Sequence, residues 1–410
     1  MSTFEHNLEK YAELIVRVGV NIQEGQTLHI NAPLAAVEFV RATVKKAYEA
    51  GAKHVYVNWE DEVLTRLKYD LAPDEAFHEF PSWVATEREE LAEKGAAFLS
   101  IKSSNPDLLK GINPERISNA NKAAGKAMEI FRNYILSDKV SWNVAAVPSP
   151  EWAAKVFPDV PKDEQVQQLW SAIFQATRAD LENPVQAWQD HSANLQSKVE
   201  YLNSKHYTAL HYTAPGTDLI VELPQKHVWI GGGSTNERGV SFTANIPTEE
   251  VFTLPLQTGV NGYVSSTKPL NYSGNVIENF TLTFESGRIV DYKAETGEET
   301  LRHLIETDEG SHYLGEVALV PHNSPISNTD IIFYNTLFDE NASCHFAIGS
   351  AYPFCLEGGK TMSKEELKQH GANSSLTHVD FMIGSEKMNI DGITADGSRE
   401  PLFRNGNWAF

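Results

Sequence analysis

Residues 339–354 read DENASCHFAIGSAYPF and residues 374–385 read SSLTHVDFMIGS, and the second half of the chain is organised around these two stretches. In the second stretch, His378 and Asp380 are two residues apart in an alternating run. If this run is a β-strand, both side chains leave the same face. A carboxylate beside an imidazole inside an apolar strand is costly unless a partner compensates it. A divalent cation is one such partner, and a plain His–Asp hydrogen bond is the other.

The first stretch has little proline or β-branched content, which predicts a helix over residues 339–352 that ends at the following proline. On such a helix Asn341 and His345 share a face, and Glu340 leans toward it. Tyr352 would then lie two turns beyond His345, on the same side. A stripe of this kind is also compatible with an ordinary buried core.

The composition restricts the kind of protein and its partners. The chain has 410 residues, enough for two domains, and its 55 acidic against 34 basic residues give a net charge of −21. This charge argues against a nucleic-acid or anionic-membrane partner, because phosphate groups would be repelled. A carboxylate excess also suits a cation-binding protein. Only Cys344 and Cys355 occur, so no disulfide framework is expected.

The start of the chain and its hydropathy predict the compartment. The opening MSTFEHNLEKYAEL is amphipathic and carries acidic residues, unlike a secretory signal or a transit peptide. No run is long and apolar enough to span a bilayer. We therefore expect a soluble, cytoplasmic protein with no membrane partner.

The first half of the chain alternates between short apolar runs and amphipathic segments. Strands are expected at residues 26–33, 53–59, 96–103 and 141–148, and helices at 3–19, 35–50, 61–69, 74–93 (in two pieces) and 114–136. This alternation indicates a parallel sheet with right-handed crossovers. A nucleotide site is not expected, because no G-x-G-x-x-G follows the first strand and no G-x-x-x-x-G-K-[ST] occurs.

The second half has a different character. A helix is expected over residues 184–204, with a buried side made of Trp188, Leu195, Val199 and Leu202. Short β-type runs follow and indicate antiparallel hairpins, for example around the Ser-Gly turn of FESGRI. We therefore predict an α/β scaffold domain with a parallel sheet over residues 1–182. Residues 183–410 are predicted to form an α+β catalytic domain with largely antiparallel strands.

Two further carboxylates in the second half do not fit a solvated surface. Glu250, next to Glu249, directly precedes an apolar β-type run, and Glu316 lies inside the run LGEVALV. A lone glutamate in such a run needs a partner. A salt bridge to Arg238 or Arg302 is one way to supply it, and a metal ion is another.

These side chains form a candidate metal-ligand set: Glu250, Glu316, Glu340, His345, His378 and Asp380. Oxygen-rich ligands with one imidazole per metal suit Zn²⁺, Co²⁺ or Mn²⁺ at a two-metal site. In such sites one carboxylate usually bridges the two ions. The spacing is not H-E-x-x-H, which excludes a thermolysin-type site.

Several long motifs carry a resemblance to a known family: NIPTEEVFTLP at 245–255, GEVALVP at 315–321, the two stretches quoted first, and YAELIVRVGVNIQEGQTLHINAP at 11–33. The chain resembles the aminopeptidase T / aminopeptidase S family of dinuclear metallopeptidases over essentially its whole length. The resemblance implies two divalent ions per chain and a peptide substrate with a free N-terminus. It also implies a distinct C-terminal catalytic domain and a homodimer with enclosed active sites.

Residue by residue, the resemblance implies that the six residues of the candidate set are the metal ligands. It makes Glu316 the bridge between the ions and Tyr352 the catalytic hydroxyl. The ions would lower the pKa of a water from 15.7 toward about 7, and Tyr352 would donate to the oxyanion. The general base is Glu249 or one of the ligand carboxylates. Competing readings are a metal-dependent amidohydrolase or phosphoesterase, and a non-enzymatic metal-binding protein with His345 and His378 in its core.

Overall fold

The computed structural model describes residues 3–103 and 105–410, which form two compact units. The first unit comprises Met1–Ala193 and Gly232–Thr248, and the second comprises Asn194–Gly231 and Glu249–Phe410. Residues 232–248 join the first unit because their backbone pairs there: the Val144 N–H donates to the Ala244 carbonyl at 2.7 Å, and the Ile246 N–H donates to the Val144 carbonyl at 3.0 Å. The division into domains 1–182 and 183–410 remains a prediction. It did not include the return of residues 232–248 to the first unit.

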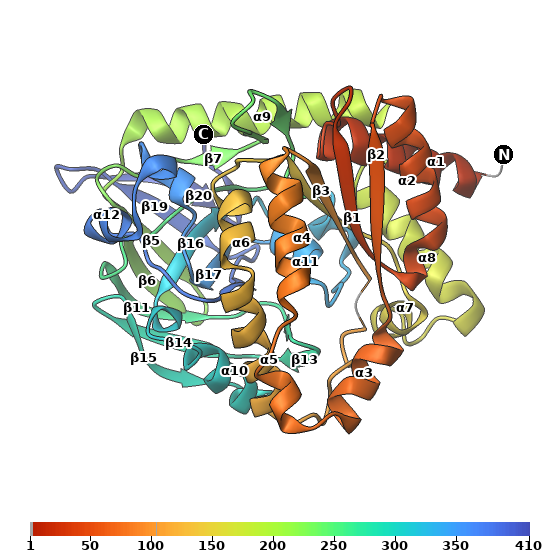
Figure 1. Ribbon diagram of the computed structural model, residues 1–410. Coiled ribbons are helices and arrows are strands. Elements are labelled where there is room, and N and C mark those ends of the chain that lie inside the picture. Colours follow the sequence, from red (N-terminus) through yellow and green to blue (C-terminus); the bar gives the residue numbers. More distant parts are fainter. Residues whose placement is uncertain (1–2, 104) are drawn as a thin grey trace. The chain divides into compact units, whose positions relative to one another are not determined.

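The first unit is built on a four-stranded parallel sheet with the order β2-β1-β3-β4 (Figure 1). The strands are β1 (Thr27–Pro33), β2 (His54–Glu60), β3 (Ala97–Lys102) and β4 (Trp142–Ala146). Each strand overlaps one of the four runs expected from the sequence, and the predicted parallel α/β arrangement is confirmed. Strand β2 lies at one edge of this sheet.

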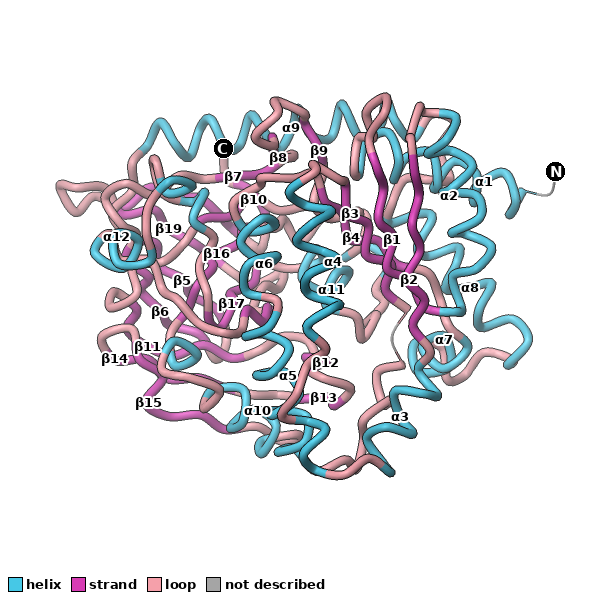
Figure 2. Tube along the Cα trace, in the orientation of Figure 1, coloured by secondary structure: helices cyan, strands magenta, loops and turns pink. Residues whose placement is uncertain are grey.

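Helices connect these strands (Figure 2): α1 (Thr3–Leu14), α2 (Val37–Glu49), α3 (Glu62–Leu71), α4 (Ser82–Glu93), α5 (Pro114–Ala127), α6 (Glu129–Leu136), α7 (Pro150–Val156) and α8 (Lys162–Ala176). Residues 15–19 continue α1 as a π-helical turn. The expectation of one helix over residues 114–136 is wrong, because Met128 leaves helical geometry (φ −92°, ψ 9°) and separates α5 from α6. None of the helices in the described ranges is long and apolar enough to cross a membrane.

Helix α9 (Pro184–Lys205) buries the side chains predicted to lie on its inner side: Trp188, Leu195, Val199 and Leu202. The second unit then contains two antiparallel sheets, an eight-stranded one with the order β15-β14-β11-β6-β5-β19-β20-β21 and a five-stranded one with the order β18-β17-β16-β10-β7. One apolar core contains side chains from both sheets, including Tyr212 and Phe346, whose ring centroids are 5.0 Å apart. The predicted antiparallel character of this half is confirmed.

The strands of the eight-stranded sheet are β5 (Ala209–Ala214), β6 (Thr217–Glu222), β11 (Val260–Ser265), β14 (Thr281–Glu285), β15 (Arg288–Lys293), β19 (Asn389–Ile393), β20 (Arg399–Arg404) and β21 (Asn407–Trp408). Those of the five-stranded sheet are β7 (Ile230–Gly231), β10 (Val251–Thr253), β16 (Leu314–Leu319), β17 (His345–Gly349) and β18 (His378–Met382). Strands β14 and β15 form the predicted hairpin. Ser286 and Gly287 both have positive φ there, as a two-residue hairpin turn requires.

The helix predicted over residues 339–352 is wrong. Helix α11 (Thr336–Asp339) ends at the start of that range, a single 3₁₀ turn covers Glu340–Ala342, and β17 follows. Strand β17 pairs with β16 on one side and β18 on the other, so the sheet takes up its backbone hydrogen-bonding groups. Long-range pairing therefore overrides the weak local preference for a helix.

Candidate metal centre

The register of the five-stranded sheet brings the candidate residues onto one face. Glu316 of β16 lies opposite Ala347 of β17, and Ala347 lies opposite Asp380 of β18. Residues that face each other across antiparallel strands point to the same side of the sheet. His345 and His378 are each two residues from a member of this row, so their side chains share its face.

The other face of the same strands is apolar. Val317, Phe346, Ile348 and Phe381 alternate with the polar residues along β16, β17 and β18, and all four belong to the apolar core of the second unit. This alternation explains how a group of carboxylates can lie in the middle of a buried sheet. On the polar face, the small side chain of Ala347 separates Glu316 from Asp380.

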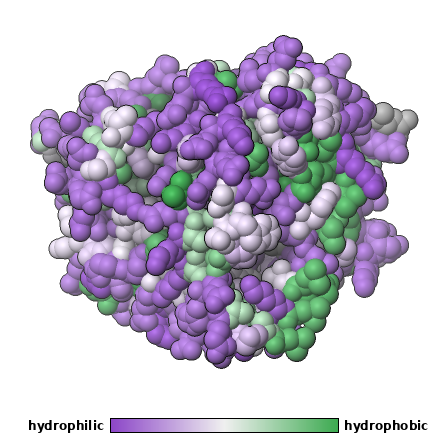
Figure 3. Space-filling model, viewed as in Figure 1, coloured by the Kyte–Doolittle hydropathy of each residue, from purple (hydrophilic) through white to green (hydrophobic). Residues whose placement is uncertain are grey.

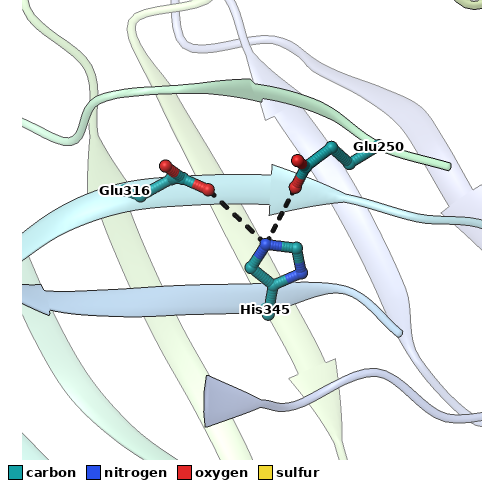
Figure 4. A group of neighbouring side chains, drawn as sticks. All are labelled: Glu250, Glu316 and His345. Atoms are coloured by element: carbon teal, nitrogen blue, oxygen red, sulfur yellow. Dashed lines mark ion pairs between the residues drawn. The ribbon is translucent and has the colours of Figure 1, made fainter. Parts of the chain in front are cut away.

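Glu250 completes the group from the neighbouring strand. It directly precedes β10, which pairs with β16 so that Phe252 lies opposite Ala318. Two residues before Phe252, Glu250 turns its carboxylate to the polar face, where its Oε2 lies 2.9 Å from His345 Nε2. Figure 4 shows Glu250 and Glu316 pointing toward the same nitrogen of His345.

The polar residues form two triads with one carboxylate in common. His345 Nε2 lies 3.5 Å from Glu316 Oε1, and His378 Nε2 lies 3.5 Å from Glu316 Oε2. His378 Nε2 is also 3.4 Å from Asp380 Oδ1. Within each triad, Glu250–Glu316–His345 and Glu316–His378–Asp380, candidate ligand atoms lie within 4.8 Å of one another. Glu316 thus directs one oxygen to each triad, as a bridging carboxylate does.

Backbone carbonyls set the orientation of both imidazoles. His345 Nδ1 lies 3.0 Å from the carbonyl oxygens of Glu340 and Ser343, and His378 Nδ1 lies 2.7 Å from the carbonyl oxygen of Ser350. A carbonyl can only accept, so each Nδ1 carries a proton. Each Nε2 is directed at the carboxylates, and once it gives up its own proton it has the orientation of the histidine nitrogens that bind metals.

Glu340 lies beside the two triads rather than within them. It is buried, and its Oε1 accepts a hydrogen bond from Asn341 Nδ2 at 3.3 Å. The Asn341 side-chain oxygen accepts the N–H of Glu249 at 2.8 Å, so this amide ties Glu340 to the segment that carries Glu249 and Glu250. We did not predict this positioning role for Asn341, because its two contacts join segments far apart in the sequence.

The salt bridges that the sequence left open as an alternative are not formed. Arg302 pairs with Glu299 and Glu306, its neighbours on helix α10 (Glu298–Ile305). Arg238 donates to the carbonyl oxygen of Lys94. The partners of Glu250 and Glu316 are therefore imidazoles of the cluster and not these arginines.

The electrostatics of the cluster favour cations. Burial, reinforced by Asp380, raises the pKa of Glu316 to about 7, and burial also raises the pKa of Glu340 well above its usual value. Burial disfavours a charged His378, but Asp380 and Glu316 outweigh it and raise the pKa of this imidazole to about 9. Without a metal, the cluster therefore holds extra protons to offset its carboxylates. Carboxylate oxygens with oriented Nε2 atoms are a donor set that fits divalent ions such as Zn²⁺, Co²⁺ or Mn²⁺.

Tyr352 lies near the cluster, although not through the helix that the sequence suggested. Its ring packs on His378, with centroids 4.7 Å apart, and stacks on Phe354 at 5.0 Å. Burial and the nearby carboxylates, Glu316 first among them, raise the pKa of Tyr352 well above its usual value. Its hydroxyl therefore stays protonated beside the His378 triad. The predicted helix would instead have placed it near His345.

Comparisons with known proteins agree with this geometry. Residues 4–408 match the family described as thermophilic metalloprotease (M29). The chain is 64% identical over 410 residues to aminopeptidase AmpS of Bacillus subtilis, covering 100% of both chains, and 58% identical to aminopeptidase 2 of Geobacillus stearothermophilus, covering 100% of this chain and 99% of the relative. The solved structure of wild-type AmpT from Thermus thermophilus superposes with a TM-score of 0.92 at 44% identity, covering 99% of this chain and 100% of that one. The family resemblance noted from the motifs is confirmed.

Proposed function

The chain belongs to the thermophilic metalloprotease family (M29) and is a peptidase, and from this premise we propose that it removes N-terminal amino acids from peptides with the help of two divalent ions. The observation that carries the two-ion part is the position of Glu316. Its two oxygens face two different imidazoles, each of which turns its Nε2 toward the carboxylates. A single-ion site would have no need for the second triad.

The proposed ligands are the residues of the two triads together with Glu340. Divalent ions held there would act as Lewis acids that lower the pKa of water to about 7 and polarise a carbonyl. Glu316 would contribute to both ion sites. The carbonyl oxygens of Glu340 and Ser350 keep the Nδ1 protons in place, so that the imidazoles present only Nε2.

Other side chains of the cluster would select and activate the substrate. The cluster would offer one ion position to the free α-amine of a peptide, which would account for hydrolysis at chain ends only. The Tyr352 hydroxyl, kept protonated, would donate a hydrogen bond to the oxyanion that forms when the peptide carbonyl is attacked. Glu249 or a ligand carboxylate would accept the proton of the attacking water.

A substrate panel tests this function directly. The purified, metal-loaded chain should hydrolyse aminoacyl-nitroanilides and leave N-acetylated analogues and phosphoesters intact. EDTA should abolish the activity, and Zn²⁺, Co²⁺ or Mn²⁺ should restore it, with about two ions bound per chain at full activity. Hydrolysis of phosphoesters or of N-acetylated amides would instead support the phosphoesterase or amidohydrolase readings, and full activity after removal of all divalent ions would exclude a metal mechanism.

We also propose that the chain forms a homodimer, because α3 presents an apolar surface to solvent. Val63, Leu64, Leu67 and Leu71 are exposed, with Leu71 at 77%, and they form a hydrophobic patch over α3 (Figure 3). Exposed apolar patches of this kind mark interaction sites. In light scattering, Leu64→Glu with Leu71→Glu should convert a dimer to a monomer, while a wild-type monomer would contradict the proposal.

A cytoplasmic location is proposed on the state of the two cysteines. Cys344 and Cys355 are both buried and both free. Free thiols are normal in a reducing compartment, whereas exported proteins tend to pair them. Fractionation of cells that express the chain would test this, with activity in the periplasmic or secreted fraction as the contrary result.

A further inference from the structure

A second group of polar side chains lies in the first unit, at the carboxyl ends of its parallel strands. Asn31 of β1 is opposite Asn58 of β2, and Pro33 is opposite Glu60. Asn31 is also opposite Ser100 of β3, so Lys102, two residues further, lies level with Pro33 and on the same face. We call Asn31, Asn58, Glu60 and Lys102, together with Arg88 of α4, the carboxyl-edge cluster.

Hydrogen bonds hold this cluster in one arrangement around Asn31. Its Oδ1 accepts from Asn58 Nδ2 at 2.7 Å and from Arg88 Nη2 at 3.2 Å. Its Nδ2 donates to Glu60 Oε1 at 2.7 Å. The guanidinium of Arg88 lies 5.8 Å from the centroid of the Phe131 ring, within the range of a cation–π contact. Only one Arg88 N–H is used by Asn31, so the other donors of this fork are available to a ligand.

The cluster contains two cations that have no ion-pair partner within the part of the chain that the structure describes. Burial lowers the pKa of both Lys102 and Arg88, while Glu60 attracts both cations and Arg88 repels Lys102. Glu60 also accepts a hydrogen bond from Asn31, so one shared carboxylate faces two positive charges. A desolvated charge that is only partly compensated is costly. An external anion would supply the additional negative charge that these two cations lack.

A groove of about 630 Å³ lies along α4, the helix that carries Arg88. Its walls are Tyr56 of β2 and one side of α4, including Trp83, Glu87 and Leu91. Tyr56 lies on the same face of β2 as Asn58 and Glu60, and it is 48% exposed, while Trp83 is 71% exposed. This volume is within the usual range of ligand pockets, roughly 300–1,000 Å³. Open parallel sheets bind their ligands at the carboxyl ends of their strands, which is where the cluster lies.

We propose that the carboxyl-edge cluster binds the C-terminal carboxylate of a peptide, and that the α4 groove holds the residues that precede it. The choice of a peptide rests on the proposed function, which makes peptides the substrates and products of this chain. The planar fork of Arg88 matches a carboxylate, and the exposed aromatic rings suit amino-acid side chains. Glu60 and Glu87 beside the cations make a doubly charged phosphate a poorer ligand than a singly charged carboxylate.

Binding of a blocked peptide tests the site without any turnover. N-acetyl-trialanine has no α-amine for an aminopeptidase to act on, and its C-terminal amide is the matched ligand without the carboxylate. In calorimetry on the full, metal-loaded chain, the acid should bind roughly tenfold or more tightly than the amide, the loss expected for a charge-assisted hydrogen bond. Equal affinities for acid and amide, or tighter binding of inorganic phosphate than of the peptide acid, would overturn the proposal.

Four variants locate the effect. Arg88→Met and Lys102→Gln should each reduce the affinity for the acid toward that for the amide. Glu60→Gln should tighten acid binding, because it removes the competing negative charge while keeping an acceptor for Asn31. Lys53→Met removes an exposed cation directly before β2, at the opposite end of that strand from Glu60, and should change nothing. Unchanged acid binding in both Arg88→Met and Lys102→Gln overturns the assignment.

Activity measurements separate this inference from the proposed function. Aminoacyl-nitroanilides carry no carboxylate, so Lys102→Gln should cleave them with the wild-type kcat/KM, whereas its affinity for N-acetyl-trialanine should fall roughly tenfold or more. Nitroanilide cleavage with identical affinities of wild type and variant for N-acetyl-trialanine overturns the carboxylate site alone. Absence of nitroanilide cleavage, with acid-selective binding of the blocked peptide retained, overturns the aminopeptidase function alone.

Discussion

Replacing Glu316 by Gln is the sharpest perturbation of the candidate metal centre, because this carboxylate is common to both triads. The amide keeps the shape of the side chain but removes its charge and turns one oxygen into a donor. Changes around metal ligands cost roughly 10- to 100-fold in affinity even when the ligand itself stays. If the affinity for each of the two ions falls about 100-fold, the combined affinity for both ions should fall by on the order of 10⁴-fold.

The same substitution should have the opposite effect on the metal-free protein. Burial raises the pKa of Glu316 from 4.5 to about 7, so the cost of ionising it in the fold grows as the pH rises from 4.5 through 7 and is complete at pH 8. A rise of this size corresponds to at most roughly 3 kcal/mol of unfavourable free energy. Glu316→Gln removes that cost, so in EDTA at pH 8 its melting temperature should be higher than that of the wild type, and with Zn²⁺ it should be lower.

Thermal melts at pH 8, with EDTA and with graded Zn²⁺, together with metal analysis and nitroanilide turnover, give the result. Glu249→Gln is the matched control: it is the same change in a neighbouring buried carboxylate that lies outside both triads. It should keep two ions and lose less activity than Glu316→Gln. If the two variants bind metal equally well and lose activity equally, or if the two melting shifts of Glu316→Gln have the same sign, the bridging assignment is refuted.

Three further predictions concern other parts of the structure. Tyr352→Phe should keep both ions and a nearly unchanged KM while kcat drops by roughly 10²–10³, the cost of one oxyanion donor; a wild-type kcat would show that Tyr352 only packs on His378. Ala347→Leu should fill the space between Glu316 and Asp380 and block metal loading without changing a charge, whereas Ala347→Ser should load normally, as metal analysis of the two variants would show. Burial, with Arg88 nearby, lowers the pKa of His29 to about 4, below its unfolded value of about 6.5, so its stabilising contribution is complete above pH 6.5 and is lost as the pH falls toward 4. In denaturant melts of the metal-loaded protein, His29→Phe should therefore lose less stability than the wild type between pH 6.5 and 5, and parallel pH profiles would contradict the burial argument.

Local patterns were sufficient for much of the fold. The period-two alternation of HVDFM placed His378 and Asp380 on one face of a strand, and the structure has both facing Glu316. The regular exchange of strands and helices in the first half predicted a parallel sheet, and the helical repeat of α9 identified its buried side. In each case the signal lies in residues close together in the chain, where backbone geometry alone fixes which side chains point the same way.

The failures have a common physical cause. Nothing in CHFAIG marks a strand, and it becomes one because β16 and β18 satisfy its backbone from both sides. Tyr352 reaches the metal centre by packing its ring on His378, a residue 26 positions further along the chain, and not by helical spacing from His345.

The composition of the metal centre was readable from the sequence, because carboxylates and imidazoles inside apolar runs need partners wherever they occur. Its arrangement was not. Glu316, His345 and Asp380 come from three different strands and Glu250 from the residue before a fourth, and only the register that aligns Glu316, Ala347 and Asp380 makes Glu316 common to both triads. Register depends on side chains that meet across strands far apart in the chain, and a slip by one residue would turn these groups into the apolar core.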